Sequence, residues 1–300
     1  MTERRPRVSI GLPVYNGEAF IADAISSFRA QSFDDFELIV SDNASTDATE
    51  DIVREFASAD PRIRYLRSET NVGANRNFNR TYYFATGEYF KWAAHDDVVE
   101  PTFIERCVSV LDDDPSVVLV HSRTSYIGGN GEALRPLARG YLGADGFVER
   151  LTLDDSVSDA LGSGDPVVRF DAVVNRMSVF YDVFGLGRTD AFRNTLLLRQ
   201  YYGSDKVFLA EMALLGPMVR LPEVLFKRRC HESASTRNAD LEGLAAWSDP
   251  SGEFAHYPLQ MINGYVDAVR ASDLPSAVKR RCLVALAAKL RSPVGLLRGR

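Results

Sequence analysis

Cysteine is scarce in this 300-residue sequence, which contains only Cys107, Cys230 and Cys282. The three are far apart in the chain, odd in number, and none forms the C-x-x-C spacing that is typical of zinc sites. The sequence therefore argues against a disulfide framework and against a zinc knuckle. So few cysteines fit a reducing compartment, and we expect a cytoplasmic protein.

Long hydrophobic runs are also lacking. No stretch approaches the roughly 18 to 20 apolar residues that a membrane-spanning helix needs. Residues 1–6 carry charges and do not contain the apolar core of a signal peptide. We expect the protein to be soluble, or to be attached to the cytoplasmic face of a membrane only at the surface.

Positive charge is in short supply, because 35 Lys and Arg residues face 41 Asp and Glu residues and the net charge is -6. A general nucleic-acid binder needs a surplus of cations on one face, so the composition argues against one. The remaining composition, with 45% hydrophobic and 25% charged residues, is that of an ordinary globular protein of one large or two modest domains.

The C-terminal end differs from the rest of the chain in its charge. Residues 279–300 contain seven basic residues and no acidic one: Lys279, Arg280, Arg281, Lys289, Arg291, Arg298 and Arg300. Apolar residues lie among these cations, as in helices that rest on an anionic membrane. A packed helix with a solvated charged face has the same pattern, and both interpretations remain open at this point.

The first third of the chain alternates between strand-like and helix-like segments. Buried strands are expected at 7–14, 36–40, 63–66 and 88–93, and amphipathic helices at 18–31, 47–57 and 74–85. This alternation predicts an α/β fold with a mostly parallel, Rossmann-like sheet flanked by helices. In such sheets ligands bind beyond the carboxyl ends of the strands.

The later elements are less regular. We expect helices at 101–111, 165–177 and 205–215, with Ser204 as the N-cap of the last, and strands at 117–127, 183–188, 219 and 224–228. The segment 140–165 is rich in Gly, Asp and Ser and is expected to be a loop or a lid. Helical patterns return from 241 to the end.

Polar clusters follow each of the first four expected strands. They are Tyr15-Asn16-Gly17, Ser41 to Asp47, Asn71-Val72-Gly73 and His95-Asp96-Asp97. Because the strands are expected to run parallel, their carboxyl ends lie at one edge of the sheet, and the four clusters should converge on one crevice.

Asp96 and Asp97 are the clearest candidates for chemistry in that crevice. Two adjacent carboxylates repel each other unless a cation or proton compensates them. Mg²⁺ and Mn²⁺ prefer such oxygen ligands, and Mg²⁺ often combines them with substrate phosphates. The alternative is an acidic start to the helix near Pro101. His231 could bind a metal or a phosphate, or be structural.

Three further candidates have plain structural alternatives. Asp42, with Asn43, could accept hydrogen bonds from a nucleobase or a ribose, or cap a turn. Asn71 to Arg76 opens a helix and offers backbone donors and a cation to a pyrophosphate. Asp205 at a helix start could be a general base, or a cap. The sequence has neither a G-x-G-x-x-G nor a Walker loop, and no G-x-S-x-G elbow.

Taken together and in order, these motifs resemble those of family 2 glycosyltransferases, which have the GT-A fold. The resemblance covers about Arg7 to His231. The segments that carry it are VSIGLPVYNGE (Val8 to Glu18), SDNASTD (Ser41 to Asp47), NVGANRNFN (Asn71 to Asn79), GEYFKWAAHDD (Gly87 to Asp97), FGLGRTDAF (Phe184 to Phe192) and GSDKVFLAEM (Gly203 to Met212).

The resemblance implies a role for each candidate. A sugar would move from a nucleotide-diphosphate sugar, with UDP as the default, to an acceptor hydroxyl, with inversion at the anomeric carbon and Asp205 as catalytic base. A bound Mn²⁺ or Mg²⁺ would stabilise the leaving diphosphate. Asp97, Asp96 and His231 would hold the metal, and the donor would contact Pro13, Tyr15, Asn16, Asp42, Asn43, Arg76 and Asp96.

The resemblance also implies a division of the chain and a biological setting. A GT-A domain would span 1–235, with a nucleotide-binding half at about 7–97 and an acceptor-binding half at 98–235, followed by a helical C-terminal extension at 236–300. The acceptor would be a saccharide or a lipid-linked glycan of the cell envelope. The chain departs from the family pattern at Ala94, where D-x-D-D has its first Asp, and at Ser204, where a Glu normally precedes the base.

Two other functions remain open from the sequence. A nucleotidyltransferase that makes sugar nucleotides shares the sheet and the metal, but it needs a basic Gly-rich loop after the first strand, and VYNGE offers no cation there. A catalytically silent sugar-nucleotide-binding module would keep the fold without the chemistry. The presence of Asp42, Asp96, Asp97 and Asp205 together favours an enzyme.

Overall fold

The computed structural model describes residues 5–137, 140–142, 148–149, 155–178, 180–232, 234, 241–248 and 257–291. An eight-stranded sheet forms the centre of the molecule, with the strand order β3-β2-β1-β4-β10-β6-β11-β5. Its strands are β1 (Val8–Val14), β2 (Phe36–Asp42), β3 (Ile63–Arg67), β4 (Tyr89–Trp92), β5 (Val98–Val99), β6 (Leu119–Ile127), β10 (Leu186–Arg188) and β11 (Met218–Arg229).

The sheet is mostly parallel, as the alternating sequence pattern predicts. β1 pairs in parallel with β2 and β4, β2 with β3, and β6 with β11. Only β10 and the short edge strand β5 run antiparallel to their neighbours. A separate three-stranded sheet contains β7 (Arg135–Leu137), β8 (Gly140–Leu142) and β9 (Val148–Glu149). The predicted α/β fold class is confirmed.

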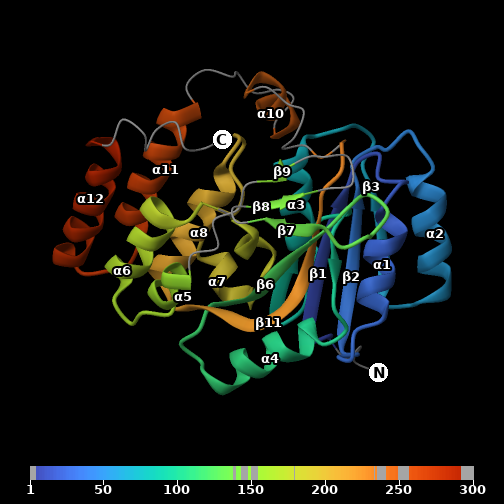
Figure 1. Ribbon diagram of the computed structural model, residues 1–300, viewed down its shortest axis with the longest axis horizontal. Coiled ribbons are helices and arrows are strands. Elements are labelled where there is room, and N and C mark those ends of the chain that lie inside the picture. The colour runs from blue at the N-terminus through green and yellow to red at the C-terminus, as the bar shows by residue number, and fades with distance from the viewer. Residues whose placement is uncertain are drawn as a thin grey trace.

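Helices cover both faces of the large sheet (Figure 1). In the first half they are α1 (Ile21–Arg29), α2 (Thr49–Ala59), α3 (Ala74–Tyr83) and α4 (Phe103–Asp113). In the second half they are α5 (Asp155–Leu161), α6 (Pro166–Asp171), a π-helical turn (Ala172–Arg176), a 3₁₀ turn (Tyr181–Phe184), α7 (Thr189–Arg193), α8 (Ser204–Leu215), α10 (Leu241–Ser248), α11 (Tyr257–Ala271) and α12 (Ser276–Arg291).

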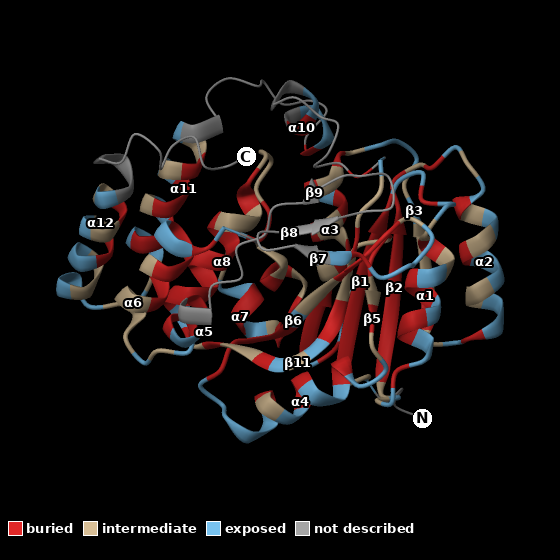
Figure 2. Ribbon diagram, in the orientation of Figure 1, coloured by how far each residue is buried: buried red, intermediate tan, exposed pale blue. Residues whose placement is uncertain are grey.

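The two faces of the sheet bury two separate apolar clusters, because side chains alternate along each strand. In β4, Phe90 and Trp92 belong to the cluster beneath α3, α7 and α8, whereas Tyr89 belongs to the cluster beneath α1 and α4. Figure 2 shows β1 and β2 buried along their length, while α2 at the edge of the molecule is largely exposed.

The C-terminal helices pack into the first of these clusters. Tyr265 of α11 and Leu286 of α12 are buried there together with Phe208 of α8. We expected the GT-A domain to end at residue 235, and residues 235–240 are outside the described residues. Beyond it, α11 contacts α8 and α12 contacts α6, so the helical extension shares a core with the sheet domain. None of the described helices is long and apolar enough to cross a membrane.

Three expected elements differ in detail. Ser204 is the first residue of α8 and not its N-cap, because its Oγ accepts a hydrogen bond from Asn75 and Gly203 occupies the cap position. The expected strand at 183–188 is a 3₁₀ turn that leads into β10. The two expected strand pieces at 219 and 224–228 form one strand, β11, whose register shifts around Pro222, a residue without a backbone donor.

Of the segment 140–165, which was expected to be a loop or a lid, the structure describes β8, β9 and α5 with the residues that follow it. The remaining residues of that segment, 143–147 and 150–154, lie outside the described residues, so the lid stays a prediction. The expected basic tail lies partly in α12, and its last residues, 292–300, also lie outside them.

Candidate active site

The loops that follow β1, β2 and β4 meet at one edge of the sheet, as the parallel arrangement predicts. The backbone N–H of Asn16 donates to Ser45 Oγ at 2.9 Å, and Asn16 Oδ1 accepts from the Thr46 N–H at 2.8 Å. A Cβ placed on Gly17 would lie 2.7 Å from His95 Cδ2, so the loop after β4 packs directly against the loop after β1.

Two of these loops contain residues with unusual backbone angles. Asn16 has φ 50° and Ala44 has φ 63°, both in the left-handed region that non-glycine residues rarely adopt. Gly73, just before α3, has φ 87°. Left-handed residues held by surrounding contacts concentrate at binding and catalytic sites. Pro13 is buried in β1 opposite Ser41 of β2, and Tyr15 is 45% exposed at this edge.

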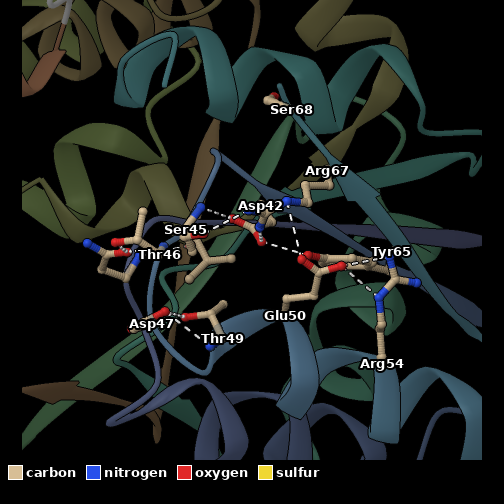
Figure 3. A network of polar contacts seen from close by, with 12 residues as sticks. Asp42, Ser45, Thr46, Asp47, Thr49, Glu50, Arg54, Tyr65, Arg67 and Ser68 are labelled. Carbon is tan, nitrogen blue, oxygen red and sulfur yellow. Dashed lines mark hydrogen bonds and ion pairs between the residues drawn. The ribbon is translucent and has the colours of Figure 1, made fainter. Parts of the chain in front are cut away.

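Asp42 is the centre of a polar network at the end of β2 (Figure 3). Its carboxylate is fully buried, and Oδ2 accepts hydrogen bonds from Tyr65 Oη and Arg67 Nη1, both at 2.6 Å. Oδ1 accepts from the Ser45 N–H at 2.8 Å. Burial, together with the hydrogen bond to Asp42, raises the pKa of the Tyr65 phenol. Asp42 therefore fixes the loop and orients Arg67, and its contact with a base stays a prediction.

Asn43 ties the loop after β2 to the start of α3. Its Nδ2 donates to Asn71 Oδ1 at 2.8 Å, and its Oδ1 accepts from the Val72 N–H at 2.9 Å. Arg76, in the first turn of α3, donates from Nε to Gln200 Oε1 at 3.1 Å. The two residues that we expect to contact a nucleotide thus lie in the loop after β2 and in the first turn of α3, which Asn43 joins.

Asp205 lies in the first turn of α8 and is half-buried. The side chain of Asn75 connects this helix to α3, because its Nδ2 donates to Ser204 Oγ at 3.1 Å and to the Tyr201 carbonyl at 3.0 Å. The N-termini of α3 and α8 are therefore adjacent. Desolvation raises the pKa of the Asp205 carboxyl, and Lys206 acts in the opposite direction.

Asp96 and Asp97 lie beyond the end of β4 and face the end of β11. Asp96 Oδ2 is 3.0 Å from His231 Nε2 and 3.3 Å from Arg228 Nη1. Asp97 Oδ1 accepts from Arg228 Nη1 at 3.1 Å and from the Arg229 N–H at 2.9 Å. The structure therefore brings together all three expected metal ligands, and it adds a guanidinium that both carboxylates share.

The two carboxyl groups differ in protonation because their surroundings differ. Burial acts against ionisation of Asp96, but Arg228 and the hydrogen bond from His231 outweigh it and lower the pKa of Asp96. Burial and the neighbouring Asp96 charge raise the pKa of Asp97 to about 6, against the effect of Arg228. The pair thus resembles two acids that share one site, of which one ionises readily and the other resists.

The donor set does not fit a closed metal site. Among the residues that the structure describes, no three His, Cys, Asp or Glu side chains are grouped to hold an ion. Asp96 Oδ2 and Asp97 Oδ1 already accept hydrogen bonds from Arg228, which a divalent ion would have to displace. Asp97 Oδ2 and His231 Nδ1 are buried without a hydrogen-bond partner, so two polar atoms here remain for a ligand.

Arg228 and Arg229 are the site residues that the sequence reasoning did not identify. Arg229 is 1% exposed on its side chain and is structural: Nε donates to the Asp96 carbonyl at 2.8 Å, Nη2 pairs with Asp23 at 2.8 Å, and the guanidinium lies 5.0 Å from the centre of the Phe20 ring. The available signal was the run of basic residues from Lys227 to Arg229 at the end of a strand.

The chain is similar in sequence to glycosyltransferases. The family model described as "Glycosyl transferase family 2" matches residues 9–184. An uncharacterized glycosyltransferase of Haemophilus influenzae is 26% identical over 230 residues, which are 76% of this chain and 67% of that protein. The glycosyltransferase RP339 of Rickettsia prowazekii is 37% identical over 116 residues, which are 38% of this chain but only 35% of that protein.

Solved structures share the fold at low sequence identity. The Staphylococcus aureus protein TarS, residues 1–349 in complex with UDP, superposes with a TM-score of 0.63 at 17% identity, over 96% of this chain and 72% of that one. The mannosyltransferase PcManGT of Pyrobaculum calidifontis, in complex with GDP-Man and Mn²⁺, gives 0.60 at 17% identity, over 99% and 73%. The GT-A fold is thereby confirmed, and because the family model matches more than half of its length, the chain belongs to glycosyl transferase family 2.

Proposed function

We propose that the protein is an inverting glycosyltransferase that moves a sugar from a nucleotide-diphosphate sugar to an acceptor hydroxyl. The observation that carries this proposal is the arrangement at the edge of the sheet. The loops after β1, β2 and β4 meet at one edge of the sheet, the Asp96–Asp97 pair lies beyond the end of β4, and Asp205 lies on a separate helix whose N-terminus is beside that of α3. An acid that is separate from the donor's charge-binding groups is what a general base requires.

Asp205 would act on the acceptor. Its carboxylate removes the proton of the acceptor hydroxyl while that oxygen forms a bond to the anomeric carbon, and the bond from that carbon to the diphosphate breaks on the opposite face. The raised pKa of Asp205, which results from desolvation, makes its carboxylate a stronger base than an exposed one. Attack from the face opposite the leaving group inverts the anomeric configuration.

The donor is proposed to be a nucleotide-diphosphate sugar with UDP as the first base to test. Support comes from TarS, solved with UDP and with UDP-GlcNAc, and from PcManGT, solved with GDP-Man. A thermal-shift panel of UDP, dTDP, GDP and their sugars would identify the base, because a ligand of the folded state raises the melting temperature.

A divalent cation, Mn²⁺ or Mg²⁺, was expected from the sequence, and the Mn²⁺ in the PcManGT structure supports it. The donor set of this chain does not, since Arg228 already lies between Asp96 and Asp97. No step of the mechanism is therefore assigned to a metal. The positive charge next to the departing diphosphate comes from the chain itself in this proposal.

The Asp205→Asn variant tests the proposed reaction. We expect transfer to fall by about 100-fold or more, because general base catalysis contributes on the order of 10² to 10⁴ in rate. Nucleotide binding should be retained. Asp190→Asn is the matched control, since the Asp190 side chain is 80% exposed near the start of α7 and pairs with nearby Arg193 in a surface contact.

Four outcomes would contradict the proposal or part of it. If Asp205→Asn transfers sugar as fast as the wild-type protein, Asp205 is not the catalytic base. If NMR shows that the product keeps the donor's anomeric configuration, the reaction is not inverting. Production of a sugar nucleotide from a nucleoside triphosphate and a sugar phosphate would identify a nucleotidyltransferase. Nucleotide binding without any turnover of donor by the wild-type protein would identify a silent binding module.

The acceptor is proposed to be a saccharide or a lipid-linked glycan in the synthesis of a cell-envelope polysaccharide or glycolipid. The observation that favours a lipid-linked acceptor lies on α12, which exposes Arg280, Arg281 and Val284 on neighbouring positions. A cationic and apolar face of this kind binds anionic membrane surfaces. It would place the enzyme at the cytoplasmic face of a membrane, where such acceptors are presented.

A further inference from the structure

The end of β11 provides three consecutive basic side chains, and the structure gives each a different partner. Lys227 pairs with Glu100 at 2.6 Å, next to the antiparallel edge strand β5. Arg229 is buried and binds Asp23 and the backbone carbonyls of Asp96, Gly128 and Gly129. The side chain of Arg228 reaches both carboxylates of the Asp96–Asp97 pair, with Nη1 at 3.3 Å and 3.1 Å from them.

Arg228 supplies positive charge next to the two carboxylates, a role that the sequence analysis assigned to a metal ion. Two buried carboxylates side by side are unstable without a compensating cation. The side chains of Arg228, Asp96 and Asp97 are 12%, 12% and 3% exposed, so solvent screens their interaction only weakly. The guanidinium binds one oxygen of each carboxylate, so a divalent ion placed at either of these two oxygens would have to displace it.

A guanidinium is also a suitable partner for the donor. Arginine presents several N–H donors in a planar fork that matches phosphate oxygens, and it remains charged at any physiological pH. Two buried polar atoms near Arg228, Asp97 Oδ2 and His231 Nδ1, have no hydrogen-bond partner in the structure.

We propose that Arg228 replaces the divalent cation in this protein: it balances the Asp96–Asp97 pair and contacts the diphosphate of the donor, so nucleotide binding needs no metal. This inference rests on the proposed function, because it takes the ligand of the site to be a nucleoside diphosphate. It predicts that Mn²⁺ has low affinity for the wild-type site, since the Arg228 guanidinium binds one oxygen of each carboxylate and its positive charge opposes a second cation.

The first measurement is calorimetry of UDP and GDP binding to the wild-type protein, in EDTA and in Mn²⁺. We expect the same affinity in both for the nucleotide that binds. Arg228→Met should weaken binding in EDTA by about 10- to 100-fold, the range for loss of a charge-assisted hydrogen bond. Arg228→Lys should lose less, and the control Lys227→Met should bind like the wild-type protein.

The second measurement is Mn²⁺ binding to the protein alone, followed by electron paramagnetic resonance. Arg228→Met should bind Mn²⁺ more tightly than the wild-type protein by about tenfold or more, because the carboxylate pair has lost its cation. The wild-type calorimetry needs no variant, so an unfolded Arg228→Met would still leave the proposal decided.

The outcomes separate the inference from the proposed function. If wild-type nucleotide binding requires Mn²⁺, or if Arg228→Met binds the nucleotide in EDTA as tightly as the wild-type protein does, the role of Arg228 is rejected and the glycosyltransferase proposal stands. If no nucleoside diphosphate binds with or without metal, both proposals are rejected.

Discussion

Lys91 shows how strongly the core acts on a single side chain. It lies fully buried in β4, its Nζ donates to the Trp92 carbonyl at 2.9 Å, and the rings of Phe28 and Phe103 lie 5.0 Å and 5.4 Å from the ammonium. Burial lowers the pKa of Lys91 to about 7, although Cys107 and Asp97 act in the opposite direction. An unfolded lysine keeps its ordinary pKa of about 10.4.

This difference predicts a stability effect with a definite pH window. Between pH 7 and 10 the unfolded chain holds the Lys91 proton and the folded chain does not, so stability rises with pH in that window. Lys91→Met removes the free-energy cost of burying an amine that is protonated in the unfolded chain. We expect the substitution to raise the free energy of unfolding at pH 7 by about 2 to 4 kcal/mol. The gain should shrink towards pH 10.

Urea denaturation of both proteins at pH 7 and pH 10 measures the effect. The difference between the two proteins isolates position 91, because other groups titrate equally in both. Lys227→Met, which changes a partly exposed lysine, should show no comparable pH dependence. A Lys91→Met protein that is less stable at pH 7 would show that the buried ammonium is charged and well compensated.

At the scale of elements, α3 can pack closely against β1 because Gly11 has no side chain. A Cβ at this position would lie 2.5 Å from Thr81 Cβ in α3 and 3.0 Å from Phe90. Gly11→Ala therefore forces α3 away from the strand, and we expect a loss of about 1 to 3 kcal/mol, as for other overpacked cores. Gly164→Ala is the control, because no atom lies within 4 Å of its Cβ.

Gly11→Ala should also affect nucleotide binding at the candidate site. α3 carries Asn75 and Arg76, so its displacement would also weaken nucleotide binding. Urea denaturation and calorimetry on the two variants measure both effects. Equal stability of Gly11→Ala and the wild-type protein would mean that α3 can shift without cost, and unchanged nucleotide affinity would separate α3 from the site.

The sequence pattern predicts the elements that repeat and misses those that depend on partners. β1, β2, β3 and β4 with the helices between them follow from periodicity, because each buries a regular apolar face. β5, with two residues, exists only because β11 lies beside it. α7 is too short for its pattern to be recognised, and the continuity of β11 across Pro222 depends on its pairing with β6.

Part of the candidate site can likewise be predicted from the sequence, and part of it cannot. Convergence of Asn16, Asp96 and their loops follows from strand direction alone, and the structure confirms it. The partners of Asp42 could not be predicted, since Tyr65 and Arg67 come from the neighbouring strand and only the register places them opposite. The partner of Asp96 and Asp97 was missed for the same reason, because Arg228 is about 130 residues away in sequence.

At the scale of the whole molecule, the C-terminal helices brace the second half of the site. Gly264 of α11 allows a close approach to α8, since a Cβ there would lie 2.5 Å from Tyr201 Oη and 3.0 Å from Val207. Figure 1 shows α11 and α12 at the end of the molecule opposite α2. The helix that carries Asp205 is thus held on one side by the sheet core and on the other by α11.

In the proposed function, α12 would also contact a membrane surface, because basic residues are concentrated at this end of the chain. Residues 279–300 carry seven of the 35 basic residues and no acidic ones, which leaves 28 basic against 41 acidic residues, or -13, in the rest of the chain. Buried Cys282 and Leu286 fix one face of α12 against the core, and Arg280 and Val284, the latter 71% exposed, lie on the other. The face that is turned outward is therefore cationic and apolar.

We expect the protein to float with vesicles that contain anionic lipid and not with neutral ones, and to be released as the salt concentration rises. Truncation at 279 is an unsuitable test, because it removes Leu286 from the core. Arg280→Ser should instead weaken binding by about fivefold, since each cation near such a surface contributes about 1 kcal/mol. Val284→Ser should weaken it further, and Arg193→Ser, which changes a side chain that is 70% exposed at the end of α7, should have no effect. Equal flotation of all four proteins would assign any membrane contact to another surface, and no flotation of the wild-type chain would reject the contact itself.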